Sequence, residues 1–158
     1  MAFYLWLLSG AGILSWIAQR TQFFPGDMSI TARLQKYHHP WLRRFFYTVS
    51  EIGFAKYAVP ETLIASGIFW ALRFRLEAFF ILLTSSSTLL NQIVKRLIKR
   101  PRPTGELVTV VKVINEPSFP SGHVMWYLNF YGLLIYLLAT NWRSGRIRNT
   151  LISVFTFL

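Results

Sequence analysis

Two short groups of residues have the types and the spacing to bind an anion. The first is Lys95, with Arg102 seven positions later and Pro103 directly after it. The second is the run Pro120-Ser121-Gly122-His123. The cations attract negative charge, and a serine–glycine pair at a helix start offers a hydroxyl and unpaired backbone N–H groups. Together these residue types indicate chemistry on a phosphate.

The cationic group follows an apolar run directly. Lys95 and Lys99 are four positions apart, so they share one face of a helix, as would Arg102 if that helix continued. The prolines at 101 and 103 instead favour an irregular exit near Arg102. Basic residues at a helix end also anchor it to lipid headgroups without any catalysis. The cationic group alone therefore leaves two interpretations open.

The second group directly precedes another apolar run. Glycine at 122 lets an anion approach the backbone closely, and the dipole of the following helix favours negative charge there. His123 is then within reach of a group bonded to that anion. The alternative is an ordinary N-cap followed by a histidine at the membrane interface. Both groups lie on the one connection between two apolar runs, and only their presence together favours a shared phosphate site.

Long apolar runs must position these residues. The chain is 53% hydrophobic and 17% aromatic, too apolar for a typical soluble domain of 158 residues. A helix that spans a bilayer needs roughly 20 mostly apolar residues. We therefore predict an all-α, polytopic transmembrane bundle forming one domain over 1–158. Charge-free runs of suitable length cover 2–19, 78–94 and 124–142, a weaker run covers 57–72, and a fifth begins at Thr150.

Glu61 interrupts the weaker run just after Pro60, where the first turn of a helix would favour an anion. The first connection, over 20–56, mixes cations with aromatic rings, which is typical of a helix lying in the membrane interface. No basic residue precedes the first run, so we expect a retained helix rather than a cleaved signal peptide.

The net charge of +11 fits nucleic acid, anionic lipid or an anionic substrate as partner. The cations lie in short stretches between apolar runs, which leaves no extended soluble surface for nucleic acid. We therefore expect membrane lipids and a lipid phosphate as partners, with the oligomeric state open. The chain has no cysteine, so it contains neither disulfides nor thiolate metal sites.

Together the two groups match a family pattern. Lys-x6-Arg-Pro followed by Pro-Ser-Gly-His resembles the first two signature motifs of the type 2 phosphatidic acid phosphatase and vanadium haloperoxidase superfamily. The resemblance extends from roughly Gly26 to the end of the chain. It implies a six-helix membrane bundle, of which about five helices are present here. It also implies hydrolysis of lipid phosphate monoesters or diphosphates through a phosphohistidine intermediate, with no metal or other cofactor.

The resemblance also implies a role for each matching residue. Lys95 and Arg102 would bind the phosphoryl oxygens, the arginine in a bidentate way. Ser121 and the N–H of Gly122 would complete the cradle, and His123 would be the general acid that protonates the leaving group. Pro103 and Pro120 would have supporting roles.

The family's third motif, a Ser-Arg pair followed by a histidine and an acidic residue, is not present. No histidine follows His123, so we expect a chain cut off before its nucleophile, with little or no phosphatase activity alone. His38 and His39 suit headgroup contacts better than nucleophilic attack. The competing interpretation is a non-catalytic membrane protein that binds anionic lipid or a partner through a retained phosphate cradle. A transporter fragment has less support, because the polar residues lie at helix ends.

Charge counting and the resemblance disagree about orientation. The first and third connections hold twelve of the seventeen cations, which would place them in the cytoplasm. The family usually faces its site outward, and catalytic cations are poor reporters of topology. We therefore expect a multi-pass cell-membrane protein with the 95–123 connection outside the cytoplasm. Which lipid phosphate would be the substrate stays open.

Overall fold

The computed structural model describes residues 2–37, 39–104, 108 and 114–158, and all regular secondary structure in these ranges is helical. The prediction of an all-α fold is confirmed. The chain divides into two compact units, each described here by itself. Unit 1 contains Met1–Pro40 and Gln92–Pro120, and unit 2 contains Trp41–Asn91 and Ser121–Leu158.

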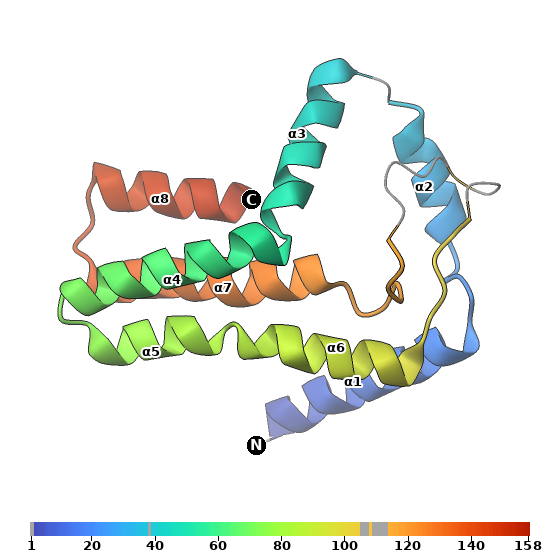
Figure 1. The fold of residues 1–158 in the computed structure, drawn as a ribbon, viewed down its shortest axis with the longest axis horizontal. Helices are drawn as coiled ribbons and strands as arrows, with labels where there is room; N and C mark the ends of the chain where they lie inside the picture. Colours follow the sequence, from blue (N-terminus) through green and yellow to red (C-terminus); the bar gives the residue numbers. More distant parts are fainter. Residues whose placement is uncertain (1, 38, 105–107, 109–113) are drawn as a thin grey trace. The chain divides into compact units, whose positions relative to one another are not determined.

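Unit 1 is built from α1 (Ala2–Arg20), α2 (Asp27–Gln35), the second half of α6 (Ser86–Ile98) and the connection that follows α6 (Figure 1). α1 coincides with the first predicted run. Gly26, directly before α2, has φ +94°, a left-handed conformation that favours glycine. The acidic Asp27 in the first turn of α2 suits the positive end of the helix dipole.

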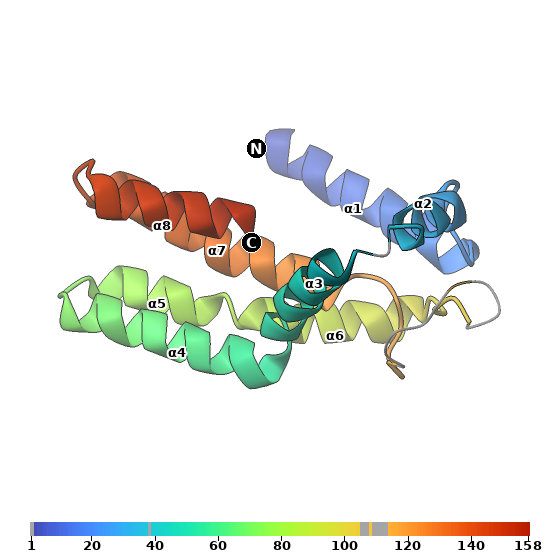
Figure 2. The same ribbon diagram turned by 90° about the horizontal axis from the view of Figure 1, so that it is seen from above.

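Unit 2 holds the main apolar core. It contains nearly all of α3 (Pro40–Ile52), together with α4 (Ala55–Ala71), α5 (Arg75–Leu83), α7 (Gly122–Asn141) and α8 (Arg146–Phe157). α4 packs on α5, α7 packs on α8, and α5 also contacts α7 (Figure 2). The side chains at the centre come from three of these helices; they are Phe69, Ile81, Trp126, Phe130 and Leu134.

The prediction that Glu61 lies in the first turn of its helix is wrong. α4 begins at Ala55, so Pro60 lies inside the helix. Glu61 is instead paired across the unit, because the Tyr131 hydroxyl donates a hydrogen bond of 2.9 Å to its carboxylate. A half-buried carboxylate among apolar helices needs such a donor.

The prediction of a single helix over 78–94 is also wrong, because this run is divided between α5 and α6 with a turn at Thr84 and Ser85. The hydroxyls of Thr84, Ser86 and Ser87 each donate to a backbone carbonyl three residues earlier, at 2.6 Å. The backbone N–H groups of Ser85, Ser87 and Thr88 likewise bond to carbonyls three residues earlier. These local bonds tighten the backbone and compete with a continuous α-helix.

The first connection contains α2 and α3 rather than one interfacial helix. α3 is strongly amphipathic: its apolar positions include Leu42, Phe45 and Val49, which share one face, and Arg43 and Arg44 lie on the opposite side. Part of the apolar face packs inside unit 2, where the centres of the Phe45 and Phe157 rings lie 5.7 Å apart. The predicted mixture of cations and aromatics therefore forms a two-sided helix.

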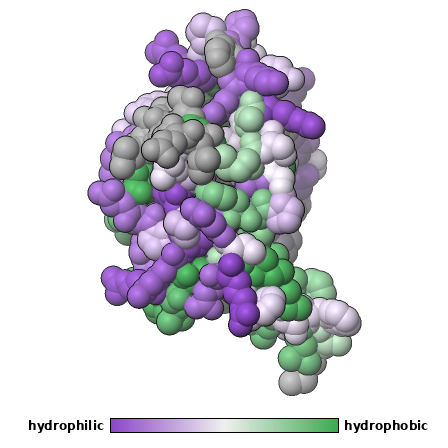
Figure 3. Space-filling model, turned by 90° about the vertical axis from the view of Figure 1, so that its right-hand side faces the viewer, coloured by the Kyte–Doolittle hydropathy of each residue, from purple (hydrophilic) through white to green (hydrophobic). Residues whose placement is uncertain are grey.

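Within the described ranges, α1 and α7 are the helices long and apolar enough to cross a membrane. In the most apolar 18-residue window of α1, only 6% of the residues are buried, and in that of α7 33% are buried. On unit 1, Figure 3 shows a hydrophobic projection at its lower edge, which corresponds to α1. Large exposed apolar surfaces of this kind are typical of membrane or protein contact. Membrane association therefore has support from α1 and α7.

Candidate phosphate-binding site

The cationic group of unit 1 begins on α6 and continues into the loop. α6 ends at Ile98, and Lys99 has φ +53° with its N–H bonded to the carbonyl of Lys95 at 2.9 Å. This left-handed residue closes the helix. Arg102 therefore lies beyond the helix, and the irregular exit predicted from the prolines is confirmed.

Lys95 and Arg102 both bind Glu116. The ammonium of Lys95 lies 2.8 Å from the Glu116 carboxylate, and Arg102 Nε donates to the Glu116 backbone carbonyl at 2.9 Å. The Lys95 side chain is only 7% exposed, whereas that of Glu116 is 51% exposed. The hydrogen bond from Lys95 holds the pKa of Glu116 below its usual range, against the opposing effect of burial. The structure thus brings the two predicted cations to one anionic residue.

Neighbouring contacts fix the loop that carries Arg102. The Arg100 guanidinium pairs with Asp27 at 2.8 Å and lies 4.1 Å from the centre of the Phe24 ring. The hydrogen bond from the Phe24 N–H, and then that from Arg100, lower the pKa of Asp27. Ser118 bonds back to the Arg100 carbonyl through its N–H, at 2.9 Å. Arg100 and Asp27 therefore position this connection, although the sequence did not single them out.

The serine–glycine group lies at the N-terminus of α7, in unit 2. Ser121 is the N-cap residue, and its hydroxyl accepts a long hydrogen bond of 3.4 Å from the Val124 N–H. The predicted helix start is therefore confirmed. A Cβ added at Gly122 would lie 3.4 Å from the side-chain oxygen of Asn91, an ordinary contact. The described packing therefore tolerates a Cβ at 122.

His123 is held against the α3–α4 corner of unit 2. Its Nε2 lies 2.9 Å from the backbone carbonyl of Ser50, and the Phe54 ring meets it edge-on at 4.7 Å. A carbonyl oxygen only accepts, so Nε2 carries the proton in this bond. Nδ1 is then the nitrogen that remains for chemistry. A Cβ at Gly53 would overlap His123 Cδ2, so this approach requires glycine at 53.

Asn91 is a buried polar residue that the sequence interpretation missed. It is 2% exposed, and its amide donates to the sulfur of Met125 at 3.1 Å. It precedes Lys95 by four positions on α6, a spacing that places the two on one helix face and could have indicated it. Glu116 and Ser50 gave no comparable signal, because their roles depend on contacts distant in sequence.

The predicted residues thus form two groups in different units: Lys95 and Arg102 in unit 1, and Ser121, Gly122 and His123 in unit 2. Pro103 and Pro120, each half-buried, flank these groups. His39 is exposed, and the predicted headgroup residue His38 lies outside the described residues. The described ranges contain no cluster of three or more metal-ligating side chains.

Comparisons of the chain with protein-family models, with curated proteins and with solved structures give no match.

Proposed function

We propose that this chain carries the phosphate-binding part of a membrane-embedded lipid phosphatase. Lys95 and Arg102 bind the phosphoryl oxygens, and Ser121 with the Gly122 N–H stabilises the charge that develops during transfer. His123 is the general acid. The substrate is a lipid phosphate monoester or diphosphate, and the resemblance to the type 2 phosphatidic acid phosphatases supplies this reaction class.

The observation that carries the proposal is the pairing of Lys95 and Arg102 with Glu116. A lysine that is only 7% exposed needs an anionic partner, and here a carboxylate provides one. A phosphate offers more acceptor oxygens and more charge than the carboxylate does. If a phosphate displaced the Glu116 carboxylate, the positive charge of Lys95 would therefore still be compensated.

The reaction divides the hydrolysis into two displacements. A nucleophilic histidine, supplied by the third motif in the family, attacks phosphorus and breaks the P–O bond to the lipid. With both ring nitrogens protonated, His123 delivers the proton on Nδ1 to the leaving oxygen while Nε2–H stays on the Ser50 carbonyl. Water then hydrolyses the phosphohistidine and releases phosphate. His38, His39 and His123 are the only histidines in these 158 residues, so we expect phosphate binding without appreciable turnover.

The proposed setting is the cell membrane, crossed several times. α1 and α7 support membrane association by length and composition. Further crossings by α4 and by α5 together with α6, and an interfacial position for α3, belong to the proposal. So does the placement of the 95–123 connection outside the cytoplasm.

The direct test is a calorimetric titration of the detergent-purified chain with inorganic phosphate and, separately, with a short-chain phosphatidate. We expect Lys95→Ala and Arg102→Ala each to weaken binding by about tenfold or more, the loss of a charge-assisted hydrogen bond. Arg96→Ala is the matched control: Arg96 is an exposed cation adjacent to Lys95 on α6, and its removal should leave affinity unchanged.

Equal losses in all three variants would mean that only general positive charge attracts the phosphate, and the proposed site would be abandoned. The second candidate function is a non-catalytic cradle for anionic lipid or a partner. It is favoured by the Lys95–Glu116 pair, because binding of an anion there needs no nucleophile. His123→Ala in a chain extended by the third motif separates the two, since only the enzyme loses phosphate release.

A further inference from the structure

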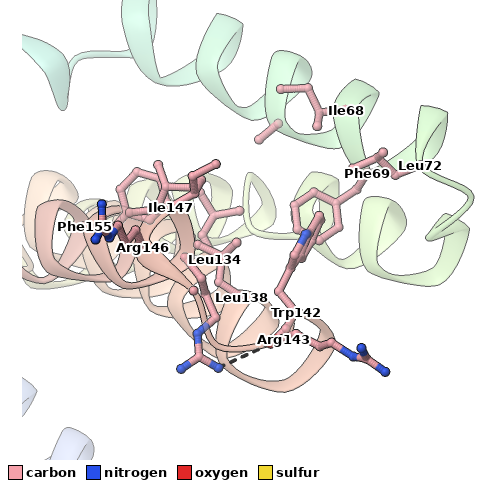
Figure 4. Close-up of a pocket in the computed structure, with 14 residues that line it drawn as sticks. Ile68, Phe69, Leu72, Leu134, Leu138, Trp142, Arg143, Arg146, Ile147 and Phe155 are labelled. Atoms are coloured by element: carbon pink, nitrogen blue, oxygen red, sulfur yellow. Dashed lines mark hydrogen bonds between the residues drawn. The ribbon is translucent and has the colours of Figure 1, made fainter.

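An apolar cavity of about 770 Å³ lies within unit 2 (Figure 4). α4, α7 and α8 form its walls. Almost all of its lining is apolar, with side chains that include Ile68, Phe69, Leu134, Leu138, Leu151 and Phe155. Its size is within the range of sites that hold small ligands.

Three arginines line this cavity where α7 passes into α8. They are Arg143, Arg146 and Arg148, and Figure 4 shows the Arg146 guanidinium on another side of the cavity from that of Arg143. Arg148 donates to the Trp142 carbonyl at 3.3 Å. In the described part of the chain, no ion pair joins any of the three to a carboxylate. The rim therefore carries positive charge that is not compensated there.

The cavity and its rim have complementary preferences. The apolar walls favour a hydrocarbon chain, at roughly 25 cal/mol per Å² of apolar surface removed from water. Guanidinium groups favour a phosphate with two acceptor oxygens. A molecule that satisfies both has an acyl chain attached to an anionic headgroup.

We propose that this cavity binds one acyl chain of an anionic membrane phospholipid, whose phosphate lies at the rim beside Arg143 and Arg148. The site is at the opposite end of α7 from Ser121, and the 20 residues of that helix extend about 30 Å. The lipid is therefore not the substrate of the proposed phosphatase. It is a bound lipid that contacts α4, α7 and α8 together.

The test is native mass spectrometry of the chain in nonionic detergent, with phosphatidylglycerol and phosphatidylcholine of identical acyl chains. We expect phosphatidylglycerol to be retained at least fivefold more. Arg143→Gln combined with Arg148→Gln should remove this preference. Arg43→Gln combined with Arg44→Gln, which removes the same charge from the exposed face of α3, should leave it intact.

Ala65→Phe tests the cavity without any change of charge, because Ala65 lines it and the larger ring would fill it. We expect this variant to retain neither lipid. A second readout uses phosphatidylglycerol with a brominated acyl chain, because bromine quenches nearby tryptophan fluorescence. We expect this lipid to quench Trp142, so that the unmodified chain is quenched more than Trp142→Phe. Equal retention of both lipids, retention unaffected by Ala65→Phe in a folded protein, or lack of quenching at Trp142 would each overturn the proposal.

This test is independent of the phosphatase proposal. Lys95 and Arg102 lie in unit 1, so the Lys95→Ala and Arg102→Ala variants should bind phosphatidylglycerol as the unmodified chain does. Failure of phosphate binding would therefore leave the lipid result standing, and the reverse also holds.

Discussion

Glu116 is the residue on which the state of the cationic group depends. Its carboxylate is the anion that a phosphate would replace at Lys95 under the proposed function. Glu116→Gln keeps the shape but removes the charge, so Lys95 pairs less strongly within the chain. We therefore expect inorganic phosphate to bind about tenfold more tightly to this variant, measured by calorimetric titration near pH 7.

The same variant has a pH signature. The pKa of Glu116 is lower in the folded chain, so the ion pair stabilises the fold fully above the unfolded pKa of about 4.3 and loses this effect as pH falls through the folded value. The contribution is at most about 1 kcal/mol, because the carboxylate is half exposed. The stability difference between the two proteins should therefore shrink below pH 4. A difference that is equal at pH 3 and pH 7 would contradict the pairing.

Gly53 controls where the His123 ring lies. A methyl group there would overlap the ring and would also lie 3.1 Å from the Tyr127 side chain. We expect Gly53→Ala to lower the free energy of unfolding by about 1–3 kcal/mol, as overpacking does. Gly67→Ala is the control. No heavy atom lies within 4 Å of the added Cβ on α4, so this change should stabilise the helix by up to about 1 kcal/mol. Equal effects at both positions would rule out the proposed contact.

At the scale of elements, the C-terminus of α4 contains a capping motif with an unusual residue. The N–H of Phe74 bonds to the Phe69 carbonyl and that of Arg73 bonds to the Trp70 carbonyl, which is the Schellman pattern. The Phe69 and Phe74 rings lie 6.2 Å apart and supply its hydrophobic contact. Arg73 occupies the left-handed position, with φ +71°, where glycine is usual.

We therefore expect Arg73→Gly to raise the free energy of unfolding by about 0.5–1 kcal/mol, since glycine adopts this conformation without steric cost. Chemical denaturation in detergent measures the change. Leu72→Gly, one position earlier at φ −78°, should destabilise the protein by a similar amount. Destabilisation by Arg73→Gly would show that the arginine side chain contributes more than its backbone conformation costs.

Hydrophobic runs were sufficient to predict where α1, α4 and α7 lie, because burial and lipid contact both select long apolar segments. They did not predict the turn at Thr84 and Ser85. Hydroxyl bonds to nearby carbonyls decide that turn, and they involve only a few residues within an otherwise charge-free run. Pro60 was similarly misread as a helix start, because an interior proline and a first-turn proline look alike in sequence.

For the whole molecule, the sequence predicted the irregular exit at Arg102 and the cap at Ser121, which depend on neighbouring residues. It did not predict Glu116 beside Lys95, 21 positions away, or the Ser50 carbonyl beside His123, 73 positions away. Such contacts depend on how distant segments fold together. Candidate site residues could therefore be proposed from sequence, while the groups that contact them in the structure could not be predicted.

The proposed membrane arrangement yields a prediction that the chain itself makes easy to test. It contains no cysteine, so single cysteines introduced at Asn115 and Ser144, both exposed, can be labelled specifically. Along the chain these positions precede and follow α7, which is long enough to cross the hydrocarbon core. In intact cells, a membrane-impermeant maleimide should label Asn115→Cys but label Ser144→Cys only after permeabilisation. Labelling of both without permeabilisation, or of neither, would mean that α7 does not cross the membrane, while the reversed pattern would place the 95–123 connection in the cytoplasm.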